Sequence, residues 1–168
     1  MQIRASSQKG QDRWQLFNHI NDDSTVANPL ATLFNDGSGV YAAAIKDGVF
    51  YQTELMNNST LYFLATTDSE GNALSRRVGE ADIGFGDVEG LANVEGQFMG
   101  ISLNFPSHTS RLISINHETG LGTLIGEGSF NVILRRLAYD PITKILYAAG
   151  IPWGEGATAV NEKNLYSI

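Results

Sequence analysis

The residue types that could do acid–base chemistry are sparse in this sequence, and His108 is the most suggestive of them. It lies in the segment FPSHTS, close to Ser107 and Ser110. A serine nucleophile activated by histidine also needs an orienting acid and donors for the oxyanion. Nothing in the spacing supplies either, so we predict no catalytic residue. His108 is retained as a candidate binding residue in a loop.

The sequence offers no strong metal motif. His19 and His117 stand at matching turn positions, which indicates a role in the turns, and no histidine pair has zinc-ligand spacing. Asp68–Asn72 alternates oxygen-bearing side chains like a calcium loop, but the distal glutamate is missing. We therefore predict no metal and no cofactor.

One glycine-rich segment favours recognition of a ligand or partner. Trp153 and Glu155 lie in IPWGEG, between two apolar runs. A tryptophan flanked by flexible turns can stack on a sugar or anchor a protein partner. The alternative is that Trp153 fills a gap inside the fold. We take Trp153, Glu155 and His108 as the candidate binding residues.

An internal repeat in the sequence predicts the strands that would position these candidate residues. Leu61–Leu64, Leu112–Ile115 and Leu165–Ile168 recur about 50 residues apart, a period typical of stacked or radial repeat folds. Between them the same landmarks follow in order: a polar turn ending in Gly, then Gly-Glu, then a Leu-Ala pair. No apolar run has helical spacing, so each period predicts four short antiparallel strands.

Turn residues fix the clearest hairpins. Lys46-Asp47-Gly48 separates the expected strands 40–45 and 49–55, and Asp-Gly is a strong hairpin signal. Glu95-Gly96 separates the expected strands 88–94 and 97–103. Asp140-Pro141 separates 131–139 from 144–151. In all, we expect about thirteen strands in an all-β chain.

The stretch LISINHETGLGTLIGEGSFNVILRRLAYDPITKILYA, from Leu112 to Ala148, resembles the divergent repeats of bacterial β-propellers of the PQQ-like and WD-repeat-like type. The resemblance covers residues 60–168 well and 13–55 loosely. It implies blades of four antiparallel strands, about three per chain. The Trp-rich docking signature of PQQ-binding blades is missing, which disfavours that cofactor.

The resemblance also implies a domain organisation. We expect a polar tail or latch strand over residues 1–12 and a repeat domain over 13–168. Its repeats run approximately over 13–59, 60–110 and 111–163, with a partial repeat over 164–168. Because a propeller ring needs at least four blades, either a second copy closes the ring or the chain is a fragment of a longer propeller.

Composition and net charge limit the classes of partner that the chain can bind. The 168 residues carry a net charge of −7, with 42% hydrophobic residues and no cysteine. The acidic balance disfavours nucleic acid and anionic membranes as partners, and no apolar run is long enough to span a bilayer. The first residues do not form a signal peptide. Extracellular, virion and cytoplasmic locations all stay open.

Two classes of function follow. The first is a non-catalytic interaction or ligand-binding module, including a structural, surface or virion component, with a protein or carbohydrate partner. The alternative is a propeller-type metal-dependent hydrolase or lactonase, with Asp87, Glu89 and Glu155 gathered at the ring axis. We favour the first because no set of catalytic residues converges in the sequence.

Overall fold

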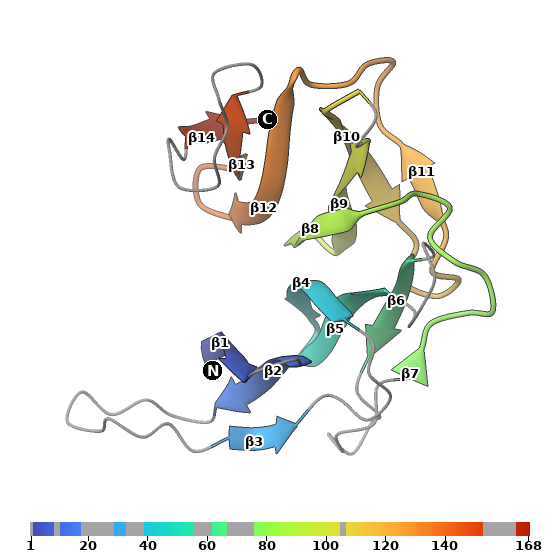
Figure 1. Ribbon diagram of the computed structural model, residues 1–168, viewed down its shortest axis with the longest axis vertical. Helices are drawn as coiled ribbons and strands as arrows, with labels where there is room; N and C mark the ends of the chain where they lie inside the picture. The colour runs from blue at the N-terminus through green and yellow to red at the C-terminus, as the bar shows by residue number, and fades with distance from the viewer. Residues whose placement is uncertain are drawn as a thin grey trace.

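The computed structural model describes the backbone of residues 2–8, 11–17, 29–32, 39–55, 62–66, 76–104, 107–152 and 164–168, and the side chains from residue 41 onward within those ranges, except at Tyr62 and Arg76. These residues form only strands and turns, so the all-β prediction is confirmed for them (Figure 1). The strands are β1 (Gln2–Gln8), β2 (Gln11–Phe17), β3 (Pro29–Thr32), β4 (Gly39–Lys46), β5 (Val49–Leu55), β6 (Tyr62–Thr66), β7 (Arg76–Arg77), β8 (Val88–Val94), β9 (Gln97–Asn104), β10 (Thr109–Ile115), β11 (Gly122–Leu124), β12 (Val132–Asp140), β13 (Ile145–Pro152) and β14 (Asn164–Ser167).

The strands form four antiparallel sheets in chain order. Sheet A contains β1-β2-β3, sheet B β4-β5-β6-β7, sheet C β8-β9-β10-β11 and sheet D β12-β13-β14. Within each sheet, neighbours in sequence are neighbours in space, which is the simplest antiparallel connection. Figure 1 shows the sheets following one another around an arc, with β4, β8 and β12 on its inner side and β7 and β11 outside.

Sheet B packs on sheet C, and sheet C on sheet D, through apolar side chains. Between sheets B and C the buried cluster includes Leu64, Phe98 and Ile113, and the Tyr51 and Phe98 rings lie 4.7 Å apart. Between sheets C and D a smaller cluster joins Ile101 to Leu134. Sheet C therefore buries apolar side chains on both faces, which explains the nearly continuous apolar runs of β8 and β9.

The predicted hairpins are confirmed. β4 pairs with β5 across Asp47-Gly48, and β8 pairs with β9 across Glu95-Gly96. All four turn residues have positive φ, the conformation that a two-residue turn of this kind requires. The two turns thus share one geometry.

The predicted repeat boundaries do not coincide with the sheet boundaries. The repeat over 60–110 contains β6 and β7 of sheet B followed by β8 and β9 of sheet C. The repeat over 111–163 likewise takes in the last two strands of sheet C and the first two of sheet D. Of the paired landmarks, Tyr62–Leu64 falls on β6 and Leu112–Ile115 on β10, the third strands of successive sheets, and Leu61 lies outside the described residues. The sequence period therefore starts halfway through a sheet.

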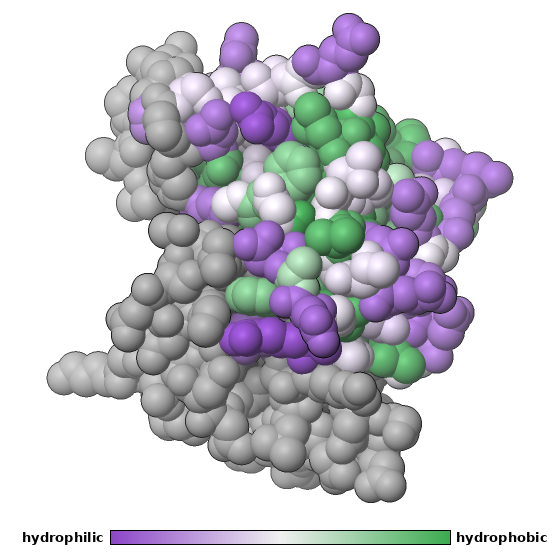
Figure 2. Space-filling model, turned by 90° about the vertical axis from the view of Figure 1, so that its right-hand side faces the viewer, coloured by the Kyte–Doolittle hydropathy of each residue, from purple (hydrophilic) through white to green (hydrophobic). Residues whose placement is uncertain are grey.

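The described surface is mixed in polarity. The large apolar side chains that stand exposed are Leu121, Leu124, Phe130, Ile142, Leu165 and Ile168. On the face drawn in Figure 2, hydrophobic residues are interspersed with hydrophilic ones over the coloured part of the molecule.

Candidate functional site

The inner strands of sheets B, C and D each carry a β-bulge at the same position. The register of β4 with β5 skips Tyr41, that of β8 with β9 skips Glu89, and that of β12 with β13 skips Arg135. A bulge leaves one residue without a partner across the ladder, adds twist and re-aims side chains. Because β4 packs on β8 and β8 on β12, the three bulges lie on adjoining strands of the inner edge.

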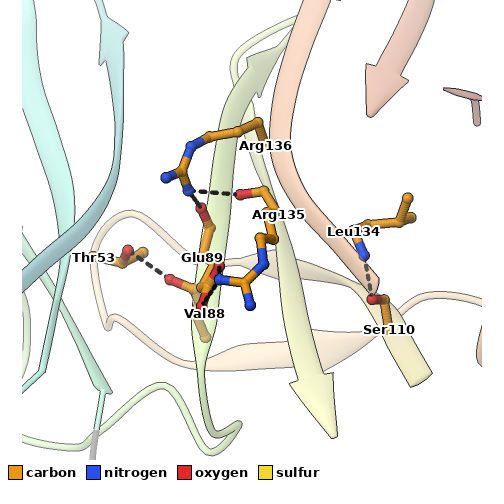
Figure 3. A network of polar contacts seen from close by, with 7 residues as sticks. All are labelled: Thr53, Val88, Glu89, Ser110, Leu134, Arg135 and Arg136. Carbon is orange, nitrogen blue, oxygen red and sulfur yellow. Dashed lines mark hydrogen bonds and ion pairs between the residues drawn. The ribbon is translucent and has the colours of Figure 1, made fainter. Parts of the chain in front are cut away.

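Two of the bulge residues contact each other across the boundary between sheets C and D. Nη1 of Arg135 donates to both carboxylate oxygens of Glu89, at 3.0 and 2.8 Å. Nη1 of Arg136 donates to the backbone oxygen of Glu89 at 3.1 Å and to that of Arg135 at 3.0 Å. Figure 3 shows both guanidinium groups reaching from β12 toward Glu89. We call these three residues the Glu89 cluster.

The electrostatics of the Glu89 cluster are dominated by burial. The Glu89 side chain is 8% exposed, whereas that of Arg135 is 43% exposed. Burial raises the pKa of the Glu89 carboxyl above its ordinary value. Arg135 and Arg136 oppose this rise and Asp87 adds to it. The ion pair therefore only partly offsets the cost of removing the carboxylate from water.

Hydrogen bonds between uncharged groups also join sheet B to sheet C and sheet C to sheet D. Thr53 of sheet B donates to the Val88 oxygen at 2.8 Å. Ser110 of sheet C donates to the Val132 oxygen at 2.8 Å and accepts from the Leu134 amide at 2.8 Å (Figure 3). Thr53 and Ser110 are fully buried. They satisfy backbone groups of β8 and β12, the edge strands of sheets C and D.

The hydrogen bonds around Glu89 favour a role in holding sheets C and D together over a role in binding a metal. Both carboxylate oxygens already accept hydrogen bonds from a cation, whereas a metal ligand must offer an oxygen lone pair to the ion. Across the described residues there is no group of three or more His, Asp or Glu side chains placed to hold a metal.

The predicted binding residues are only partly covered by the structure. Trp153 and Glu155 lie outside the described residues, as do His19 and the segment 68–72. His108 is described: it has positive φ and sits in the β9–β10 turn, partly exposed. The Ser110 hydroxyl beside it is held by the β12 backbone. A binding role for His108 stays a prediction.

Sequence reasoning placed Glu89 in a catalytic alternative and did not find its pairing with Arg135. One signal was available. In Val88-Glu89-Gly90-Leu91 and in Leu134-Arg135-Arg136-Leu137 the apolar residues are three apart, which breaks the two-residue period of a regular strand. An inserted bulge residue restores the burial of both apolar positions.

The sequence matches no family model and none of the curated proteins. The described part of the chain contains no helix of the length and apolarity needed to cross a membrane.

Proposed function

We propose that this chain forms consecutive blades of a β-propeller-type domain and works as a non-catalytic interaction or ligand-binding module. The observation that carries the proposal is the row of equivalent bulges on β4, β8 and β12. Repeated features on adjoining first strands are expected where sheets repeat by rotation about a common axis. Four sheets packed in chain order supply the blades.

The absence of catalysis in this proposal rests on what the inner-edge groups do. In propeller enzymes, axial side chains must stay available to metal or substrate. Here the carboxylate of Glu89, on the inner strand β8, is engaged by Arg135. The alternative, a metal-dependent hydrolase or lactonase using Asp87, Glu89 and Glu155, would require the Glu89–Arg135 pair to open.

Metal content separates the two functions. The purified chain is incubated with Ca²⁺, Mg²⁺, Mn²⁺ and Zn²⁺, dialysed, and analysed by mass spectrometry of the metals. We expect no stoichiometric ion. One divalent ion per chain, lost on Asp87→Asn and Glu89→Gln substitution but retained in Glu127→Gln, would establish the hydrolase alternative instead.

We also propose that a second copy of the chain completes the ring. Among the described residues, sheets A and D have three strands, whereas sheets B and C have four. Strands from a neighbouring copy can extend such sheets through backbone hydrogen bonds. Native mass spectrometry should give twice the 18.2 kDa chain mass. A monomer at micromolar concentration would argue against completion by a second copy.

A further inference from the structure

A small cavity opens at one end of sheet C, away from the Glu89 cluster. It measures about 300 Å³ and lies between the β8–β9 turn and the β10–β11 turn. The lining side chains that matter here come from β9, β10, β11 and the second turn: Gln97, Ser114, Asn116, His117, Leu121 and Thr123. This volume is at the lower end of the range for small-molecule sites.

The turn that walls the cavity is fixed by its own hydrogen bonds. Oδ1 of Asn116 accepts from the amides of Glu118 at 2.8 Å and Thr119 at 3.0 Å. The Asn116 amide donates to the Leu121 oxygen at 2.9 Å, and the Gly120 amide donates to the Asn116 oxygen at 2.8 Å. Such a side-chain-capped turn holds one shape, so the cavity is largely preformed.

The lining chemistry matches a neutral polyhydroxylated ligand. Gln97 and Thr123 carry an amide and a hydroxyl group that both donate and accept hydrogen bonds, and the Ser114 hydroxyl, which donates to the Thr123 backbone oxygen at 3.5 Å, can still accept one. Gln97 and Thr123 are exposed, and Leu121 is 48% exposed. A sugar ring presents the complementary pattern, with hydroxyl groups on its edge and an apolar C–H face for Leu121.

The net negative charge of the chain argues against an acidic ligand. Glu95 and Glu118 adjoin the lining residues Gly96 and His117 in the sequence. Glu95 is paired with Lys144 at 3.3 Å and accepts from Tyr139 at 3.2 Å. The chain as a whole carries −7. An anion would approach against this field.

We infer that this cavity binds a neutral saccharide of one or two rings. The inference rests on the proposed function, because it names the ligand class of the binding module.

The test is a titration of ¹⁵N-labelled protein followed by amide chemical shifts. Glucose, galactose, N-acetylglucosamine and maltose serve as neutral probes, and glucuronate as the acidic probe. We expect at least one neutral sugar to give saturable shifts centred on Gln97, Ser114, His117 and Thr123. Gln97→Ala and Thr123→Val should weaken that binding at least tenfold. Ser129→Ala, an exposed hydroxyl in another loop, is the matched control and should leave it unchanged.

Three results would overturn the inference: no saturable shift with any neutral sugar, equal binding of glucuronate, or unchanged affinity in both cavity variants. Saturable shifts centred on other residues would reject this cavity while supporting a ligand-binding module. A stoichiometric metal ion in the separate metal analysis would reject the module itself, whatever the sugars do.

Discussion

At the scale of single residues, Glu89 is a buried carboxyl group paired with a cation. Its side chain is 8% exposed and is held by Arg135, whose side chain is 43% exposed. Its raised pKa indicates that burial outweighs the attraction of Arg135 and Arg136. The pair therefore contributes mainly to how sheets C and D register against each other, and less to net stability.

Removing the guanidinium group of Arg135 should show how much the burial of the Glu89 carboxylate costs. Arg135→Met keeps the bulk of the side chain but leaves the Glu89 carboxylate buried without its main partner. We expect a loss of about 2 kcal/mol in the free energy of unfolding at pH 7, which shrinks as the pH falls and Glu89 becomes protonated. Urea unfolding at pH 7 and at a lower pH, where Glu89 is protonated, measures this loss. Arg111→Met on β10 is the control, and an equal loss at both pH values would contradict the account.

Glu89→Gln removes the titration itself. Because the folded-state pKa of Glu89 is raised, its contribution to stability is present at low pH and is lost as the pH rises through that pKa. Wild type should therefore lose stability relative to Glu89→Gln over the pH range that begins near the ordinary glutamate pKa of about 4.3 and extends upward through the raised folded-state pKa. Paired urea titrations across this range follow the difference. A gain by wild type over the same range would mean that the ion pair outweighs burial.

At the scale of elements, buried hydroxyl groups join one sheet to the next. Ser110→Ala would leave the Leu134 amide and the Val132 oxygen without their partner in a buried position. We expect a loss of about 2 kcal/mol, together with faster hydrogen exchange at the Leu134 amide. Ser129→Ala should change neither quantity. Unaltered exchange at Leu134 in Ser110→Ala would show that this bond does not hold β12.

Close backbone approach joins the loops of sheets B and C. Gly120 has φ of +77°, and an added Cβ would lie 2.5 Å from the Val78 oxygen. Gly126 has nearly the same φ, +75°, but open space around the same position. Gly126→Ala should thus report only the backbone strain, about 1 kcal/mol, and Gly120→Ala about 3 kcal/mol or more. Equal losses in urea unfolding would mean that the loops do not pack as closely as the structure has them.

Local chemistry made the hairpins predictable and long-range packing made the Glu89 cluster unpredictable. The turns at Asp47-Gly48 and Glu95-Gly96 depend on residues adjacent in sequence, and the expected strand 88–94 coincides with β8. The contact of Glu89 with Arg135 spans 46 positions and depends on how two sheets pack. Sequence periodicity carries no such information.

At the scale of the whole molecule, we propose that the sheets are related to one another by rotation about a common axis. If the sheets were stacked parallel to one another, equivalent residues of neighbouring sheets would be equally far apart on the first strands and on the last strands. Sheets fanned about an axis bring first strands close together and move last strands apart. The contacts of β4 with β8 and of β8 with β12 fit the second arrangement.

Distances between spin labels test this most directly, since the sequence has no cysteine and labels go only where cysteines are placed. One double variant labels the equivalent hairpin turns of the inner strands, Asp47→Cys with Glu95→Cys. The other labels equivalent positions after the outer strands β7 and β11, Glu80→Cys with Glu127→Cys. All four side chains are exposed. The account predicts a clearly longer distance for the outer pair than for the inner pair, and equal distances would contradict it.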